Sequence, residues 1–268
     1  MEDETVNLLD NDRFHLLGFE KPELNGSTEQ LEINGVDGVL PSVTTYGPYE
    51  LTLNFRYVGV DPIDVDIFCF NLEQKIQKET PYYLSFSEMP GLKYAVLPSP
   101  KVSPSPFAFR YVDFEITFTV YKGYAESLMS TDNLELNSDF WQFGNNIVTN
   151  EDLQYTHHKT KFDIYNASPI TVTPINRHNL IITMNIQAPN GFKLKNKKTG
   201  DVFEYKKALK KSDTLVLNGV YPYKNKKRCG KDTNWEFITL ASGYNAFEVI
   251  GDGVEVEEIG FSFNFVYR

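Results

Sequence analysis

Few side chains of this sequence suggest catalysis. The adjacent pair His157 and His158 is its one concentration of histidine, and the simpler interpretation is two exposed residues in a connecting segment. The sequence contains no nucleophile elbow, phosphate-binding glycine loop, zinc-protease helix, EF-hand loop or dinucleotide fingerprint. We therefore expect no catalytic residue and a protein that is not an enzyme. An enzyme would require a cleft that holds paired carboxylates or histidines of perturbed pKa.

Acidic and thiol side chains give equally little support for a metal or cofactor. Asp61, Asp64 and Asp66 could collect a cation, but acidic residues at the start of a helix are better explained by the helix dipole. Cys69 and Cys229 stand far apart, without histidine or cysteine at ligand spacing. The sequence therefore predicts no metal site, no cofactor and no disulfide framework.

Basic residues are concentrated in one part of the second half. Between Lys193 and Lys231 there are 13 Lys or Arg against three acidic residues. The simpler interpretation is solvated strand edges and hairpin tips, where lysine also prevents strand pairing. The alternative is contact with an anionic partner, either an acidic protein surface or an anionic polymer. The lysines that would make this contact are Lys197, Lys198, Lys207, Lys211, Lys226 and Lys227.

The strongest pattern in the first half is the run FRYVDFEITFTVY, residues 109–121. Apolar side chains alternate with polar and aromatic ones over about a dozen residues, which predicts a strand longer than the usual five or six residues. One face should be core. The other face, which mixes charge, threonine and aromatic rings, suggests a sheet that continues into a larger assembly. The members of this outward face are Glu115, Thr117, Thr119 and Tyr121.

The elements around this strand follow from caps and turns. Residues 61–80 predict the best helix of the chain, with Asp61 as cap and Pro62 in the first position. Residues 31–41, with Asn-Gly and Asp-Gly, predict a hairpin, and residues 49–59 alternate as a half-buried strand. The proline-rich segment 98–106 is predicted to be an exposed loop or arm leading into the long strand, because proline removes backbone donors.

The two halves of the chain differ in charge and pattern. Residues 1–130 hold 20 acidic and 9 basic side chains, whereas residues 131–268 hold 16 and 17. The pattern breaks around residues 128–145, and we divide the chain into domains 1–135 and 136–268. Beyond the break, short strands recur between turns, as in an antiparallel β-sandwich. The predicted strands there include 170–175 and 235–240. No run approaches the ~18 apolar residues of a membrane span.

Several segments together resemble the distal tail proteins (Dit) of siphophages, the bacteriophages with long non-contractile tails. In the first half these are GVDGVLP, YELTLNFRYVG with FNLEQKI, YYLSFSEMPGLKYAV and FAFRYVDFEITFTVYKGYAES. In the second half they are YNASPITVTPI, DTLVLNG, LASGYNAFEVIG and IGFSFNFVYR. The ordered set, including the turn formed by Leu240, Gly243 and Asn245, is more specific than any one piece.

The resemblance implies a fold and a function. The fold would be mostly β with one helix: an α+β belt domain that forms a ring, followed by a galectin-like antiparallel β-sandwich. The protein would be a homohexameric hub in the virion, at the distal end of the tail, made in the host cytoplasm. It would join the tail tube to the tip or receptor-binding apparatus. The outward face of the long strand, Glu115, Thr117, Thr119 and Tyr121, would then be the candidate ring interface.

The same resemblance implies the partners. These are further copies of the chain, the tail tube, the tape-measure protein and the tail-tip or tail-associated proteins. A receptor-binding protein or a host cell-wall polymer would be a further partner. DNA would only pass through the channel, and no membrane would be involved. The alternative function is a carbohydrate-binding, galectin-like module for adhesion to the host cell wall, with Trp235, Tyr221 or Tyr223 as stacking platforms.

Overall fold

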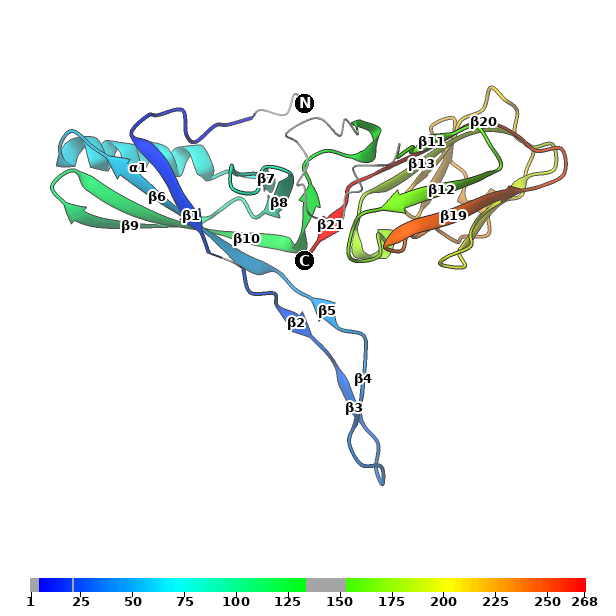
Figure 1. The fold of residues 1–268 in the computed structure, drawn as a ribbon, viewed down its shortest axis with the longest axis horizontal. Coiled ribbons are helices and arrows are strands. Elements are labelled where there is room, and N and C mark those ends of the chain that lie inside the picture. The colour runs from blue at the N-terminus through cyan, green and yellow to red at the C-terminus, as the bar shows by residue number, and fades with distance from the viewer. Residues whose placement is uncertain (1–4, 21, 134–152) are drawn as a thin grey trace. The chain divides into compact units, whose positions relative to one another are not determined.

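The computed structural model describes residues 5–20, 22–133 and 153–268 (Figure 1). It is built mostly from antiparallel strands, with a single α-helix among these residues, so the predicted fold class is confirmed. The chain divides into two compact units. Unit 1 comprises residues up to 88, residues 93–125 and Arg268, and unit 2 comprises residues 89–92 and 126–267. The predicted boundary between residues 135 and 136 lies outside the described residues.

The main sheet of unit 1 has β10 at its centre. The strand order is β1-β6-β10-β8-β7, and β9 pairs with the first half of β10 on the side opposite β6. The backbone of β10 therefore has a partner on both sides. The strands are β1 (Phe14–Phe19), β6 (Tyr49–Val58), β7 (Tyr82–Leu84), β8 (Leu92–Val96), β9 (Lys101–Ala108) and β10 (Tyr111–Ser127).

The alternation predicted for the long strand is confirmed. The inward side chains of β10 are almost completely buried, while the four of the candidate ring interface are half-buried or exposed. The inward set is Val112, Phe114, Ile116, Phe118 and Val120.

One face of the sheet packs against α1 (Pro62–Ile76) (Figure 1). The Phe68 ring stacks on Tyr57 at 3.8 Å between ring centroids and also contacts Phe14 and Phe114. The predicted helix start is confirmed, because the Asp61 side chain accepts a hydrogen bond from the Asp64 N–H and Pro62 occupies the first turn. The helix is thus fixed to the sheet by aromatic packing.

The proline-rich segment is a strand, so the predicted loop is wrong. Residues 101–108 form β9, in which Pro104 lies opposite Phe114 and Pro106 opposite Val112. Successive N–H groups of a strand point to opposite sides, so two prolines spaced by two lack the N–H on the same side. The hydrogen bonds between β9 and β10 are kept when the missing N–H groups face away from β10. The number of prolines in the sequence predicts a loop, whereas their spacing is compatible with an edge strand.

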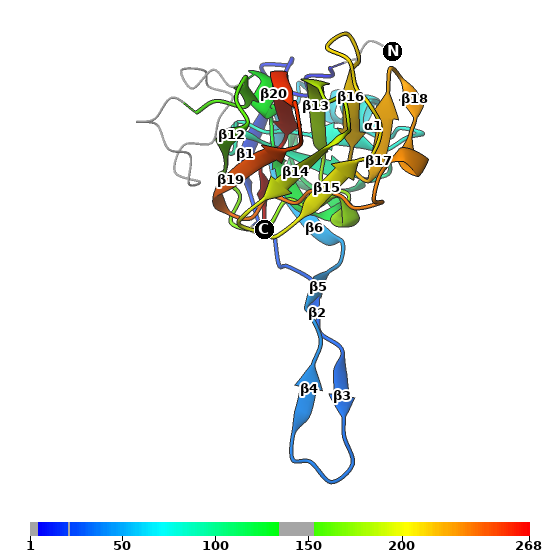
Figure 2. The ribbon, with the colours of Figure 1, turned by 90° about the vertical axis from the view of Figure 1, so that its right-hand side faces the viewer.

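A long hairpin projects from unit 1 (Figure 1, Figure 2). We call residues 24–47 the arm. Its base pairs β2 (Gly26–Ser27) with β5 (Thr45–Tyr46), and its outer part pairs β3 (Gln30–Glu32) with β4 (Val39–Pro41). The hairpin predicted from the Asn-Gly and Asp-Gly turns is therefore confirmed, with positive φ angles at the two turn glycines, Gly35 and Gly38.

Unit 2 is a sandwich of two antiparallel sheets. The Phe261 ring of one sheet contacts Phe162 and Phe247 of the other, so the core lies between them. The six-stranded sheet contains β11 (Thr156–His157), β20 (Glu255–Phe263), β13 (Leu180–Gln187), β16 (Leu215–Asn218), β17 (Tyr221–Lys224) and β18 (Lys227–Arg228). The four-stranded sheet contains β12 (Lys161–Asn166), β19 (Gly243–Ile250), β14 (Phe192–Asn196) and β15 (Val202–Tyr205).

Short elements complete unit 2. The final strand β21 pairs with β10, whose last two residues belong to unit 2. The short elements of unit 2 are the 3-10 helices η1 (Thr131–Asn133), η2 (Pro174–Asn176) and η3 (Gly230–Asp232) and the strand β21 (Val266–Tyr267).

Two strands expected in unit 2 do not form. Residues 170–175 and 235–240 meet only in an isolated bridge between Val172 and Leu240. Side-chain amides replace part of the missing ladder, since the buried Asn166 donates from Nδ2 to the Leu240 carbonyl at 2.9 Å. A pattern of alternating residues does not show that side-chain amides bond the backbone in place of a neighbouring strand. The predicted strands at residues 170–175 and 235–240 are therefore wrong.

Within the described part of the chain, no helix has the length and apolar character needed to cross a membrane.

Candidate functional site

The two predicted histidines serve packing. The His157 ring stacks on Phe162 at 4.6 Å between centroids, and its Nε2 lies 3.0 Å from the Gln154 carbonyl oxygen. Burial lowers the pKa of His157, which disfavours the charged form. His158 contacts the Glu257 carbonyl oxygen through Nδ1. Both rings are therefore held by backbone carbonyls and an aromatic neighbour, in a structural role.

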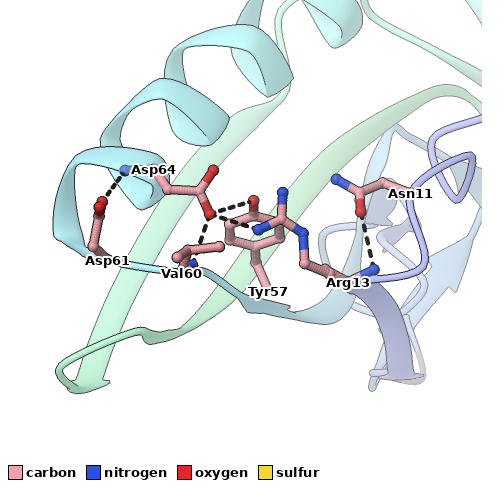
Figure 3. Close-up of polar contacts among 6 residues, drawn as sticks. All are labelled: Asn11, Arg13, Tyr57, Val60, Asp61 and Asp64. Atoms are coloured by element: carbon pink, nitrogen blue, oxygen red, sulfur yellow. Dashed lines mark hydrogen bonds and ion pairs between the residues drawn. The ribbon is translucent and has the colours of Figure 1, made fainter.

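The aspartates at the helix start form a structural network (Figure 3). Asp64 Oδ2 accepts hydrogen bonds from the Val60 N–H at 2.8 Å and the Tyr57 hydroxyl at 3.0 Å, and it pairs with Arg13 Nη1 at 2.8 Å. The Val60 N–H, followed by Tyr57 and Arg13, holds the pKa of Asp64 below its usual range. Asp64 thereby ties β1, β6 and α1 together.

Asp66 is exposed on the helix. Among the described residues, no group of three or more His, Cys, Asp or Glu is placed to hold a metal ion.

A groove in unit 1 does not supply the arrangement that an enzyme would require. It has a volume of about 600 Å³ and lies between residues 6–11 and α1. Val6, Leu8 and Leu72 contribute apolar walls, and the only acidic side chain in its lining is Asp10, which pairs with Lys75 at 3.1 Å. No histidine lines it. Paired carboxylates are therefore missing from this groove.

The candidate ring interface occupies the face of β10 opposite α1. The Thr117 hydroxyl hydrogen-bonds the Thr52 hydroxyl at 2.9 Å, and Arg56 pairs with Asp113 at 2.8 Å on the same face. Glu115 and Tyr121 are exposed, and Thr119 is half-buried. Because β10 is paired on both sides along Tyr111–Thr117, a partner could reach this stretch only through its side chains. The structure brings the four residues together on one polar surface.

The six candidate lysines divide into two groups. Lys197 pairs with Glu248 at 2.8 Å, Lys211 pairs with Glu255 at 2.9 Å, and the Lys198 ammonium donates to the Ser242 carbonyl. The other three are exposed and form no ion pair with another described residue. The second group, Lys207, Lys226 and Lys227, can therefore meet an anionic partner without breaking an ion pair or hydrogen bond of the kind that holds the first group.

The arm exposes many apolar side chains. Six of its side chains are 45–87% exposed: Leu31, Ile33, Val36, Val39, Leu40 and Val43. A two-stranded hairpin is marginally stable in water by itself, and apolar surface of this kind marks an interaction site. The arm also lacks positive charge, because the sequence has no Lys or Arg between Pro22 and Phe55.

The helix α1 has a second apolar surface. Ile63, Ile67 and Phe70 are 69%, 55% and 63% exposed and follow the i, i+4, i+7 spacing of one helix face. We call these three residues the helix stripe. The sequence prediction did not include the helix stripe, because the buried face of α1 already accounts for the apolar periodicity of this segment.

The base of the arm is in close contact with β10. Gly123 has φ +74°, and a Cβ there would lie 2.7 Å from the Gly47 carbonyl oxygen. Only glycine fits both the backbone angle and the space. Beside it, the Arg268 guanidinium lies 4.3 Å from the centre of the Tyr46 ring. The root of the arm is thus built into unit 1, while the rest of it is exposed.

Comparisons with known proteins agree with this architecture. Residues 5–120 match the family model for the phage tail protein RIFT-related domain. The SPP1 Dit protein, whose crystal structure is described as a paradigm of the hub adsorption apparatus in phages infecting Gram-positive bacteria, aligns with a TM-score of 0.66. The alignment has 11% sequence identity and covers 95% of this chain and 94% of that chain.

Two further structural likenesses are weaker. The phage p2 baseplate in its activated conformation aligns with a TM-score of 0.43 and 10% identity, both with calcium and with strontium. The alignments cover 99% and 98% of this chain and 94% of the matched chains. No curated protein matches the sequence. The family match and the SPP1 Dit fold confirm the resemblance to siphophage distal tail proteins that the sequence predicts.

Proposed function

We propose that this chain, a siphophage protein of the distal-tail type, is a structural hub of the phage tail tip that assembles as a homohexameric ring. The ring joins the tail tube to the tip or receptor-binding apparatus, at the distal end of the virion tail. The observation that carries the proposal is the arm, whose apolar side chains are exposed in the isolated chain. Such a surface requires a partner.

The helix stripe supplies a matching surface. Each chain carries one arm and one helix stripe, and the side chains of both remain exposed, so the two surfaces do not cover one another within a chain. A contact between different surfaces of identical chains is heterologous, and such contacts close into rings when the rotation permits. We propose that the arm of one subunit lies on the helix stripe of its neighbour. The number six follows from the resemblance to the distal tail proteins.

The polar face of β10 is the second proposed contact of the ring. Glu115, Thr117, Thr119 and Tyr121 would meet a neighbour through side chains. The remaining partners are the tail tube, the tape-measure protein and the tail-associated proteins, and DNA passes through the ring without being held. The acidic balance of residues 1–130 supports this, because an acidic surface repels the phosphate backbone. We propose a structural role rather than an enzymatic one.

The experiment is shortening of the arm without disturbance of its base. Ser27 and Thr45 lie directly opposite each other, so residues 28–44 can be replaced by Asn-Gly, which closes a two-residue hairpin loop. We expect wild type to give a sixfold species in native mass spectrometry and the shortened variant to give a folded monomer.

A matched control keeps the arm and changes one exposed polar residue, Thr28→Ser. The variant Phe70→Ser, on the helix stripe, should reduce assembly as the shortened arm does. A shortened variant that still forms the ring would contradict the role of the arm, and a monomeric wild type would contradict the ring itself.

A further inference from the structure

An exposed tryptophan in unit 2 is held in an unusual position. Trp235 is 73% exposed and has φ 65°, a left-handed conformation that side chains with a Cβ rarely adopt. Its ring rests on Gly230, where an added Cβ would lie 2.8 Å from the Trp235 Cζ3 atom. Packing of the core does not explain an indole that remains mostly in solvent. Strained residues of this kind cluster at sites that bind ligands.

The loop beneath the tryptophan is rigidly fixed. The Trp235 N–H donates to Thr233 Oγ1 at 3.2 Å, and Thr233 is buried. The neighbouring Asn234 donates to the Val202 carbonyl at 2.7 Å and accepts from the Glu204 N–H at 3.0 Å. These bonds hold the ring in place before any partner arrives, which lowers the entropic cost of binding.

An arginine lies close to this ring. Arg228 is two residues before Gly230, so their Cα atoms are at most about 7 Å apart. Its guanidinium lies 4.9 Å from the centre of the Tyr221 ring, and Arg228 lies directly opposite Tyr223 in the pairing of β17 with β18. The register places Tyr221, Tyr223 and Arg228 on the outer face of the six-stranded sheet. Figure 2 shows β17 and β18 at the end of that sheet. The indole of Trp235, which packs on Gly230, and the guanidinium of Arg228, two residues earlier in the chain, thus lie at the same end of unit 2.

Two further lysines extend the positive charge. Lys226 and Lys227 lie at the turn between β17 and β18, where Asn225 has φ 48° and Lys226 has φ 67°. A turn with two positive φ angles normally has glycine in its second position. Here that position presents a lysine to solvent. Both lysines are exposed and form no ion pair with another described residue.

We infer that these residues form a binding site for a phosphate-bearing glycopolymer. We call it the aromatic-basic site; its members are Tyr221, Tyr223, Lys226, Lys227, Arg228 and Trp235. The apolar face of a sugar ring would stack on the indole of Trp235, while Arg228 and the lysines bind the neighbouring phosphate. This inference does not depend on the ring proposed above, because every member lies within one chain.

Single-stranded nucleic acid is the less suitable polymer. It needs successive rings on which bases stack, together with a positive groove. Only Trp235 offers an open ring here, since the guanidinium of Arg228 already lies over Tyr221. A polymer in which sugars alternate with phosphates along a flexible chain needs one stacking ring beside one cationic cluster.

The test measures binding of the full-length protein to glucosylated poly(glycerol phosphate) by titration calorimetry. The comparison probes are unsubstituted poly(glycerol phosphate), neutral maltohexaose and a single-stranded dT12 oligonucleotide. We expect the glucosylated polymer to bind at least tenfold more tightly than any of the three, with affinity that falls as salt is added.

The variants separate stacking from charge. Trp235→Ala should weaken binding of the glucosylated polymer about tenfold or more, whereas Trp235→Phe should retain most of the wild-type affinity. Reversal of Lys226 and Lys227 to Glu should weaken binding and reduce its salt dependence, because Arg228 alone then binds the phosphate. The matched controls are Tyr244→Ala, which removes an exposed ring elsewhere in unit 2, and Lys159→Glu, which reverses an exposed lysine. Both should bind as wild type does.

Several outcomes would overturn the inference. These are the absence of binding to the glucosylated polymer, an unchanged affinity in Trp235→Ala, equal losses in the control variants, or tighter binding of dT12. Circular dichroism of each variant confirms that the sandwich is intact, so a loss of binding reports on the site and not on folding.

Discussion

Replacement of Phe114 by alanine should test which face of β10 is core. Phe114 is 1% exposed, and its ring lies 6.0 Å from Phe14 and 5.8 Å from Phe68, centroid to centroid. Truncation of a buried Phe costs about 3–5 kcal/mol, and the cost is larger where the surroundings do not collapse into the cavity. Strands pair with β10 on both sides at this position, opposite Phe55 and Pro104, so the backbone is fixed. We therefore expect about 4–5 kcal/mol.

The assay is calorimetric unfolding of the full chain. For a unit of about 120 residues, 1 kcal/mol lowers the melting temperature by roughly 4 °C, so the transition of unit 1 should fall by about 15–20 °C. The matched control is Glu115→Gln, one residue away on the opposite face. It should alter stability by less than about 0.5 kcal/mol and weaken assembly instead. Equal losses of stability in both variants would refute the assignment of the two faces.

Three further predictions concern unit 2. The fragment 126–268 should be more stable than the fragment 146–268 by about 2–4 kcal/mol. The shorter fragment loses the hydrogen bonds of Thr131 to the backbone of Phe261 and Phe263, at 2.8 and 3.1 Å, and other bonds of residues 127–129. Coincident thermal melts of the two fragments would contradict this. Hydrogen bonds from the Lys210 N–H, Lys224 and Asn225 lower the pKa of Asp213 to about 2, so its stabilising contribution should be present above about pH 4 and lost as the pH falls to about 2. In Asp213→Asn, the denaturant midpoint should lose that part of its acid dependence, and an unchanged slope would contradict the assignment. Finally, reversal of Lys207, Lys226 and Lys227 to Glu should leave the ring intact, change stability little and abolish salt-sensitive binding of an anionic tail protein or cell-wall polymer in pull-down. Identical binding by wild type and variant at low and high salt would leave these lysines as solvated strand edges.

Short sequence patterns were sufficient to predict the elements whose residue types alternate regularly or mark a cap or turn. The faces of β10 follow from a period of two, and the start of α1 follows from Asp61 and Pro62. The hairpin of the arm follows from its turn dipeptides. In each case the signal lies within a few consecutive residues, and tertiary packing agrees with it.

The remaining features depend on the environment of a segment. The strand β9 was missed because the spacing of its prolines relative to β10, not their number, decides whether pairing is possible. Residues 170–175 were read as a strand because alternation does not show that a buried Asn166 satisfies the Leu240 carbonyl. Exposure of the helix stripe and the left-handed backbone of Trp235 also become visible only when the surrounding chain is in place.

The absence of positive charge from the arm determines which proteases can cut it. Trypsin cleaves after Lys and Arg, and the sequence has neither from Pro22 to Phe55, so trypsin should leave the arm whole even in the free chain. A protease that cleaves after glutamate meets Glu23, Glu29 and Glu32, all of them exposed. If a neighbour covers the arm, those bonds become resistant as the ring forms. Digestion with the glutamate-specific protease therefore distinguishes covered arms from free ones without any change to the sequence, and trypsin serves as the control that leaves the arm whole in both.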